Sequence, residues 1–379
     1  QQWDALVAAS GSDVYFTYDW CCTWWRHYGT GRQLRVLEFR RNGQLVGLLP
    51  LLIERLWLGP VPIRLARLIG SDFTTIVLSP PVLAEDAEAI YRIALAFALR
   101  DQRCDAIWLG PLSGERPHRE HIRQACRASG PLARIVRDHD LGVHTVFHLP
   151  RTYDEYLASL DKSQRGNIRR DRRNLEKQCR LACDTVVEPQ CADGLFDEFL
   201  ALHQAQWRSQ GMLGHFGDWP GAASFNRDLV RTLAPRGRVR LIRLSDDNRT
   251  ISCEYCFAFA ETLCWRLPAR RTGEPWDRLG LGRVSLAWLI EQSIPTGIRR
   301  IEAGAGHYDY KVRMGGTEYP LGSILVAANR RSALLKARLL CRASDLLHLL
   351  YYRIWFGRIA PRLPLPRRPL WKLWIRSRV

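Results

Sequence analysis

A short stretch near the end of the chain concentrates titratable side chains. It is GAGHYDYKVRMGG, residues 304–316, and it directly follows IRRIEAG, residues 298–304, a run typical of a buried strand. The five titratable residues are His307, Tyr308, Asp309, Tyr310 and Lys311. Two interpretations fit them: a solvated loop, or the wall of a reaction site that supplies a base, an acid and a cation.

The composition is that of a globular protein with a strong positive charge. The 379 residues are 46% hydrophobic, enough for two ordinary domains with their own cores. With 56 Lys and Arg against 38 Asp and Glu, the net charge is +18, which favours anionic lipid, nucleic acid or phosphate-bearing donors as partners. Nucleic acid is the least favoured, because the chain has no recognisable nucleic-acid-binding module. Eleven cysteines form no disulfide framework, and the lone CEYC at 253–256 lacks a second ligand pair, so we expect no metal.

The predicted elements follow the same order twice. The first half reads as helix, hairpin, helix and strand, and the second half as helix, three-stranded meander, helix and strand. The hairpin at 34–51, which turns at Asn42-Gly43, aligns with the hairpin at 239–257. This alignment indicates an internal duplication. We therefore expect an α/β (α+β) fold of two tandem units, with mixed, mainly antiparallel sheets flanked by helices.

Two basic segments lie outside the predicted sheets. The expected units are 1–150 and 181–329, joined by a connecting helix at 151–180 that is rich in arginine and is broken near Gly166. This helix is either a solvated connection or a clamp for phosphates or an acidic surface. The tail, 330–379, is expected to be a separate helical, basic and amphipathic segment that associates with a membrane.

The tail combines charge with aromatic and aliphatic side chains. From Arg330 onward it holds thirteen Lys or Arg and one acid, Asp345, among leucines and the terminal Trp371 and Trp374. This composition is typical of a segment that lies in the interface of an anionic bilayer. The other interpretation is a helix packed on the protein's own core.

The order of motifs resembles a known superfamily. The chain is similar to the GNAT-superfamily acyltransferases related to the cellulose-biosynthesis-associated acetyltransferases and, more distantly, to the Fem-type peptidoglycan aminoacyltransferases, over about residues 1–328. The similarity rests on an ordered series of segments, at 17–52, 163–177, 202–211, 279–294 and 297–316. The resemblance implies two tandem GNAT-like units, with the working site in the second unit and the acceptor near their junction.

The resemblance also implies a binding site for an acyl thioester. In GNAT enzymes the anionic arm of the donor lies on a glycine-rich turn at a helix N-terminus. RLGLGRVS supplies Gly280, Gly282 and Arg283 for this role. Asp277 stands where the family places a basic or amide residue, and a carboxylate repels a pyrophosphate. The donor is therefore left open between acyl-CoA and an acyl carrier protein thioester.

Roles for the 304–316 stretch follow from the resemblance and from acyl-transfer chemistry. Lys311 matches a lysine of the Fem-type relatives that stabilises the oxyanion formed by attack on the carbonyl. His307, with an ordinary pKa of about 6.5, is the natural base, and Asp309 orients it or accepts the proton itself. If the segment is extended, Tyr308 and Tyr310 point to opposite sides, so one of them, assigned here as Tyr310, protonates the leaving thiolate.

Four further residues complete the predicted site. Glu302 and Glu254 lie on predicted strands, where a buried carboxylate needs a partner; Glu302 is an alternative base and Glu254 a candidate for the substrate pocket. His203 and Trp207 are four residues apart and share one helical face. They line either the acceptor pocket or the hydrophobic core.

These observations favour an acyltransferase that acts by direct attack. The tail favours a lipid acceptor, such as the amine of a sphingoid base, as in bacterial ceramide synthases, which are GNAT-like proteins of this kind. Alternatives are an O- or N-acetyltransferase of exopolysaccharide or lipid-linked sugar, a non-catalytic assembly factor, and RNA-dependent aminoacyl transfer. No window has the roughly 18 apolar residues that a spanning helix needs, and no leader is evident, so we expect a cytoplasmic protein associated peripherally with the inner membrane.

Overall fold

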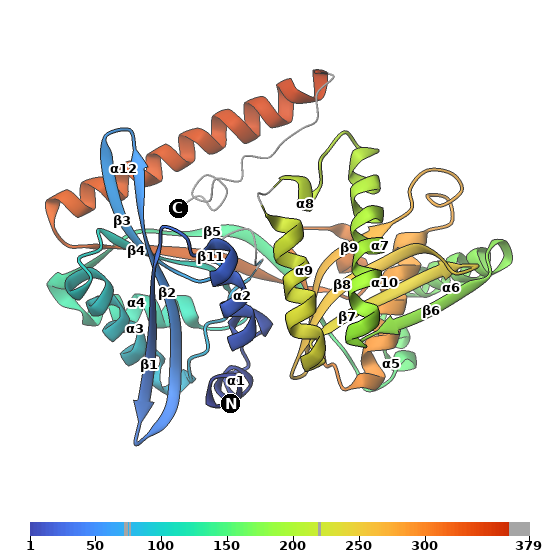
Figure 1. Ribbon diagram of the computed structural model, residues 1–379, viewed down its shortest axis with the longest axis horizontal. Helices are drawn as coiled ribbons and strands as arrows, with labels where there is room; N and C mark the ends of the chain where they lie inside the picture. The colour runs from blue at the N-terminus through green and yellow to red at the C-terminus, as the bar shows by residue number, and fades with distance from the viewer. Residues whose placement is uncertain (72–74, 76, 219–220, 364–379) are drawn as a thin grey trace. The chain divides into compact units, whose positions relative to one another are not determined.

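The computed structural model describes residues 1–71, 75, 77–218 and 221–363. The described chain forms two compact units (Figure 1). Unit 1 comprises 1–143 and 319–363, and unit 2 comprises 144–318. These limits differ from the predicted division at 150 and 181, because the helices at 151–180 belong to unit 2 and the chain after 318 returns to unit 1.

Unit 1 contains strands in the order β1-β2-β3-β4-β11, with the first part of β5 next to β11. The strands are β1 (Gln33–Arg41), β2 (Gln44–Leu58), β3 (Val61–Leu68), β4 (Ala106–Ser113), β5 (Ala133–His148) and β11 (Thr317–Ala328). The helices are α1 (Gln2–Ala9), α2 (Tyr18–Tyr28), α3 (Ala87–Ala96), α4 (His118–Ala128) and α12 (Arg331–His348). Helices α3 and α4 lie side by side (Figure 1).

Unit 2 contains strands in the order β10-β9-β8-β7-β6, with the last part of β5 next to β10. The strands are β6 (Leu181–Val186), β7 (Val239–Asp246), β8 (Arg249–Phe259), β9 (Thr262–Arg270) and β10 (Arg300–Ala305). The helices are α5 (Tyr153–Ser159), α6 (Lys162–Gln178), α7 (Pro189–Arg208), α8 (His215–Asp218), α9 (Ala222–Leu233), α10 (Leu281–Ser293) and α11 (Asp309–Arg313).

The same pairing pattern occurs in both units. In each, three antiparallel strands, β1-β2-β3 and β7-β8-β9, are followed by a strand that pairs in parallel, β4 with β3 and β10 with β9. An antiparallel neighbour comes next, and in unit 2 strand β6 adds a further antiparallel strand beside β7. The aligned hairpins both turn through two residues with positive φ, Asn42-Gly43 and Asp247-Asn248. Such turns match the right-handed twist of the strands. The predicted fold class is confirmed.

Unit 2 is inserted into the sequence of unit 1, whose last strand comes from a distant part of the chain. Strand β11 follows unit 2 in the chain but pairs with β4 of unit 1. Conversely, the end of β5, at 144–148, pairs with β10 of unit 2. The two units are therefore not consecutive segments of the sequence.

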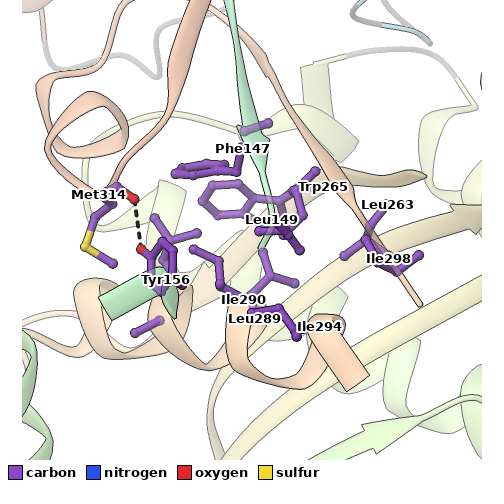
Figure 2. Packing of buried hydrophobic residues seen from close by; sticks show 14 of the residues in the cluster. Phe147, Leu149, Tyr156, Leu263, Trp265, Leu289, Ile290, Ile294, Ile298 and Met314 are labelled. Carbon is purple, nitrogen blue, oxygen red and sulfur yellow. Dashed lines mark hydrogen bonds between the residues drawn. The ribbon is translucent and has the colours of Figure 1, made fainter. Parts of the chain in front are cut away.

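Helices cover both faces of the unit 2 sheet. On β8, Tyr255 packs against Phe196 and Phe199 of α7. Its neighbour Cys256 lies in the core cluster that includes Leu289 of α10. Since successive residues of a strand face opposite sides, α7 and α10 cover opposite faces of the sheet. Figure 2 shows the cluster on the α10 side, with Trp265 and Phe147 packed over the helix.

Two local predictions are wrong. The basic segment is broken at Leu160–Asp161 and not at Gly166, because Asp161 caps α6 by accepting a hydrogen bond from the backbone N–H of Gln164 at 2.8 Å. Gly166 lies within α6. The 309–313 segment is a short helix, α11, and is not extended, so the expected alternation of Tyr308 and Tyr310 does not occur.

The described part of the tail packs on unit 1. Helix α12 places Ala337, Leu340 and Cys341 against strands β3, β4 and β11. The face of α12 that carries these residues therefore packs on the protein's own core, as one of the two interpretations of the tail predicted. Trp371 and Trp374 lie outside the described residues. Within the described ranges, no helix combines the length and apolar character needed to span a bilayer.

A hydrogen bond fixes the segment that follows α11. The hydroxyl group of Tyr156 in α5 donates to the backbone oxygen of Met314 at 2.8 Å, inside the cluster of Figure 2. The ring of Tyr156 stacks on Tyr153, with centroids 5.7 Å apart. Because both partners of the hydrogen bond are buried, its loss leaves the carbonyl of Met314 unsatisfied.

We expect the Tyr156→Phe variant to lower the free energy of unfolding by about 1–2 kcal/mol, because it leaves a buried carbonyl without a donor. Chemical denaturation measures this change. Tyr153→Phe is the matched control, because it removes a hydroxyl group from the stacked ring without breaking that bond. Equal losses in the two variants would show that the bond to Met314 does not contribute.

Candidate active site

Lys311 is a buried cation of unit 2. The side chain is 5% exposed, and Nζ donates a hydrogen bond to the backbone oxygen of Ala303 at 2.6 Å. Nζ also lies 4.5 Å from the ring centroid of Tyr308 and 5.7 Å from that of Trp265. Burial lowers the pKa of Lys311 to about 8, although two nearby carboxylates oppose this shift. The ammonium group is therefore poorly solvated, and it loses its proton more easily than an ordinary lysine.

The separation of two strands creates the place for this side chain. Parallel pairing between β9 and β10 ends at Cys264 and Glu302, although both strands continue. The next residue of β10 is Ala303, whose carbonyl oxygen accepts the hydrogen bond from Lys311. Lys311 thus satisfies a backbone group at the point where the strands separate.

Glu254 is a buried carboxylate of the site. It lies on β8, is 2% exposed, and accepts hydrogen bonds from Nε1 of Trp265 at 2.6 Å and from the hydroxyl group of Ser285. Ser285 in turn lies 2.7 Å from the hydroxyl oxygen of Ser252. Burial raises the pKa of Glu254 to about 7, and the hydrogen bonds from Ser285 and Trp265 limit the increase. The carboxylate therefore exchanges a proton close to neutral pH.

Trp265 connects the two charged groups. Its ring lies beside the ammonium group of Lys311, and its N–H donates to Glu254. The sequence did not indicate Trp265, Ser252 or Ser285, because an aromatic residue on a strand and small residues on a helix or strand are usually core positions. Only the structure reveals the role of Trp265, since this residue follows Cys264, the last residue of β9 that pairs with β10.

Tyr310 lies within electrostatic range of Glu254. Its side chain is half-exposed, and desolvation of its hydroxyl group, followed by the charge of Glu254, raises its pKa. The rings of Tyr308 and Tyr310 are 5.8 Å apart, so both tyrosines lie on the Lys311 side of α11. Lys311 and Tyr310, predicted from one stretch, and Glu254, predicted from a separate strand, are thus brought into one region.

Glu302 has several donors of its own. Its carboxylate lies 3.0 Å from Nδ1 of His144, accepts a hydrogen bond from Arg300 at 3.0 Å, and accepts another from the backbone N–H of Gly304 at 3.1 Å. This arrangement favours a positioning role, in which Glu302 holds the end of β10 near Lys311. The sequence did not indicate His144.

His307 lies between two carboxylates. Its Nδ1 is 2.7 Å from Glu318 and its Nε2 is 3.0 Å from Asp309, and the side chain is 62% exposed. Hydrogen bonding to Glu318, and then to Asp309, raises the pKa of His307. Both ring nitrogens are engaged and the charged form is favoured. This geometry does not favour His307, oriented by Asp309, as the general base.

The N-terminus of α10, where the donor was predicted to bind, already faces a carboxylate. Gly280 caps the helix with φ of 66°, and a Cβ at that position would collide with the carboxylate of Asp171 in α6. Asp171 is 4% exposed and pairs with Arg283 and Arg170. Arg283 is therefore engaged within the protein. Any anionic donor group must displace Asp171 from Arg283 or bind beside this pair.

Contacts within the protein account for the presence of Asp277 and Gly282 at their positions. The carboxylate of Asp277 accepts a hydrogen bond from the backbone N–H of Gly273 at 2.8 Å and lies 3.8 Å from Arg270. A Cβ at Gly282 would contact the side chain of Arg270 at 3.4 Å. Arg270, which the sequence did not single out, is thus the cation that lies over the first turn of α10.

His203 and Trp207 belong to an aromatic cluster on α7. His203 is buried, with Nδ1 at 3.1 Å from the backbone oxygen of Pro268 and Nε2 at 3.2 Å from His215. Burial lowers the pKa of His203 to about 4, so the ring is neutral at physiological pH. Trp207 packs edge-on against His215. These contacts are those expected if both residues pack in the hydrophobic core, which was one of the two predicted alternatives.

Among the residues that the structure describes, no three His, Cys, Asp or Glu side chains converge as metal ligands. Cys253 and Cys256 of the CEYC stretch are both buried free thiols on β8. Burial raises the pKa of each thiol well above its ordinary value. This is the opposite of what a nucleophilic or metal-binding thiolate needs.

Residues 162–312, which hold all the groups described above except His144 and Glu318, match the family model of the acetyltransferase (GNAT) domain. The fold is GNAT-like. A search of curated protein sequences gave no significant match.

Solved structures with this fold extend over nearly the whole chain. FemX is similar at a TM-score of 0.65 and 13% identity, with 89% of this chain and 98% of FemX covered. A conserved protein of unknown function from Bacteroides thetaiotaomicron has a TM-score of 0.53 and 12% identity, with 86% and 96% covered. The C-terminal domain of a putative lysylphosphatidylglycerol synthetase from Agrobacterium fabrum has a TM-score of 0.51 and 11% identity, with 92% and 95% covered. At these identities the similarity establishes the fold alone.

The raised pKa of Glu254 predicts a pH-dependent stability. An unfolded glutamate titrates at about 4.3. The folded state therefore favours the neutral carboxyl group, and this stabilisation is present at low pH and is lost as the pH rises through about 7. Relative to Glu254→Gln, the wild type should lose about 3 kcal/mol of unfolding free energy between about pH 4 and about pH 8.

Urea unfolding of both proteins across this pH range measures the difference. Glu176→Gln, which changes an exposed carboxylate on α6, is the control and should track the wild type. A difference between Glu254→Gln and wild type that does not vary with pH would contradict the assignment.

Proposed function

We propose that this protein is an N-acyltransferase that moves an acyl group from a thioester to an amine by direct attack, without a covalent enzyme intermediate. The GNAT-like domain supports acyl transfer as the class of reaction. The observation that supports it most strongly is the array of a buried ammonium group, an indole ring and a buried carboxylate formed by Lys311, Trp265 and Glu254.

Lys311 stabilises the negative charge that develops on the thioester oxygen. An ammonium group has three N–H donors, and the bond to Ala303 uses one of them. The low exposure of Lys311 makes its charge more effective than it would be in water. Its lowered pKa sets a limit on this role, because the group must remain protonated.

Glu254 and Tyr310 carry out the two proton transfers of the reaction. As the amine nitrogen bonds to the carbonyl carbon, it gives up one proton, and Glu254 is the acceptor. As the carbon–sulfur bond breaks, the thiolate takes one proton from the hydroxyl group of Tyr310. The proton held by Glu254 then restores Tyr310, so that no proton is gained or lost overall. The effect of the Glu254 charge on the pKa of Tyr310 supports the pairing.

The donor proposed here is a long-chain acyl thioester carried by coenzyme A or by an acyl carrier protein. Two arginines offer positive charge to the donor. Arg270 lies over the first turn of α10, and Arg283 is partly neutralised by its ion pair with Asp171. Helix α6 adds exposed Lys162, Arg169, Arg173 and Lys177 along one side. An acidic carrier protein would complement that side.

The acceptor proposed here is the amine of a membrane lipid precursor such as a sphingoid base. Two observations support a lipid: the exposed leucines and arginines of α12, and the fold relative named for lysylphosphatidylglycerol. A short-chain transfer to a sugar amine is the competing outcome.

The two perturbed pKa values predict a bell-shaped pH profile. Activity requires ionised Glu254 and protonated Lys311, so the rate should rise through about pH 7 and fall above about pH 8. Lys311→Ala and Glu254→Gln should each lower kcat/KM by about 10²-fold or more. Mass spectrometry of the products measures both the pH profile and the substrate specificity. The donors are acetyl and palmitoyl thioesters of coenzyme A and of carrier protein, and the acceptors are a long-chain amino alcohol and a sugar amine.

The matched control is His307→Ala, which removes an exposed titratable group and should keep most of the activity. A long-chain amide formed by the wild type and lost in Lys311→Ala supports the proposal. Formation of acetylated sugar alone would show that the acceptor is a sugar amine and not a lipid amine. Product formation that survives Lys311→Ala would disprove the mechanism, and no product with any pair would favour an assembly factor.

A further inference from the structure

Helix α12 has two different apolar faces. The inner face packs on the unit 1 sheet through small or medium side chains. Its buried residues are Ala333, Ala337, Leu340, Cys341 and Ser344. The outer face carries Leu335, Leu339 and Leu346, which are 69%, 40% and 55% exposed. Their spacing places them along one side of the helix, opposite the buried residues.

Ion pairs at both ends fix how the helix is rotated. Arg330 and Lys336 each bond to the buried carboxylate of Asp105, at 3.1 and 3.0 Å. Near the other end, Arg137 of β5 pairs with Asp345. Because these contacts and the inner face hold α12 in one orientation, the outer leucines cannot turn inward. Their exposure is a property of the fold.

The exposed apolar surface continues beyond α12. The following turns, Leu349–Ile359, have the wider winding of a π-helix and continue directly from α12. Leu349, Leu350, Ile354, Trp355 and Ile359 are all exposed in this segment. Single exposed leucines are ordinary, but eight exposed large apolar side chains within residues 335–359 are typical of an interaction site. We call these eight residues the outer face; Figure 1 shows α12, which carries the first three of them, as the long orange-red helix.

Basic side chains accompany the outer face. Arg338 and Arg342 are exposed between its leucines, and Arg353 and Arg358 are exposed in the continuation. Between 331 and 359 the sequence has one acid, Asp345, and that carboxylate is engaged by Arg137. An apolar row flanked by arginines is complementary to a surface that is apolar inside and anionic outside. The headgroup region of an anionic bilayer has this chemistry.

We propose that the outer face is a docking surface for an anionic lipid bilayer, with the helix parallel to the membrane plane and its leucines at the level of the acyl chains. A second copy of the chain would bring arginines of the same face together and is less complementary. Docking is a binding property that does not require catalysis, but it would present a lipid amine to the proposed acyltransferase.

Sedimentation with vesicles tests this surface without any donor or acceptor. The full-length protein should bind vesicles that contain phosphatidylglycerol and should bind pure phosphatidylcholine vesicles much more weakly. Leu335→Glu combined with Leu339→Glu and Leu346→Glu should reduce the bound fraction at least about tenfold. Arg338→Ala with Arg342→Ala should weaken binding to the anionic vesicles and reduce its sensitivity to salt.

Matched variants separate docking from folding and from catalysis. Leu335→Glu alone is compared with Ile93→Glu, which adds the same charge at a 51% exposed position of α3 and should bind as the wild type does. Circular dichroism verifies that each variant is folded. Lys311→Ala should bind vesicles normally, so loss of activity and loss of docking are distinguishable.

Two results would overturn the proposal. In the first, Leu335→Glu and the triple variant both bind vesicles as well as the wild type does. The other is no binding of the wild type to anionic vesicles at low salt, together with a dimer that Leu335→Glu dissociates. That second result would assign the outer face to self-association.

Discussion

The hydrogen bond from the ammonium group of Lys311 to the carbonyl oxygen of Ala303 is the interaction on which the site depends. Two parallel strands that stop pairing inside a protein leave backbone groups without partners, and an unsatisfied buried carbonyl costs on the order of 1–3 kcal/mol. Lys311 supplies the missing donor. The same contact holds α11 against the sheet, and with it the rings of Tyr308 and Tyr310.

This solution has an electrostatic cost. A charged amine and a carboxylate are both kept almost completely out of water, and each has a pKa moved towards neutrality. Neither arrangement is the most stable one for a folded protein, and a purely structural role would be served by neutral side chains of similar size. Groups poised in this way are typical of reaction sites, where strength of interaction with a transient charge outweighs stability. The indole of Trp265 accommodates both charges at once, since its face attracts cations and its N–H binds anions.

The sequence predicted the outline of the fold well and the site in part. Period-two and helical patterns, with the turn at Asn42-Gly43, were sufficient to indicate two copies of one α/β unit, because these are local signals. Lys311 and Glu254 were recognised as separate candidates, but residue order cannot show that Trp265 bridges them. His307 illustrates the opposite limit. Its pKa depends on Glu318, which lies on the next strand, so a residue that looks like a base has both nitrogens engaged by carboxylates.

The insertion of unit 2 between the two parts of unit 1 has a consequence for biosynthesis. The first unit is missing β11 until nearly the whole chain has left the ribosome, whereas the second unit has all its described strands once β10 has emerged. The nascent first sheet therefore waits with β4 unpaired on one side, an edge made of strongly apolar residues. Completion of the second unit thus precedes completion of the first, and no single cut in the polypeptide yields two whole units.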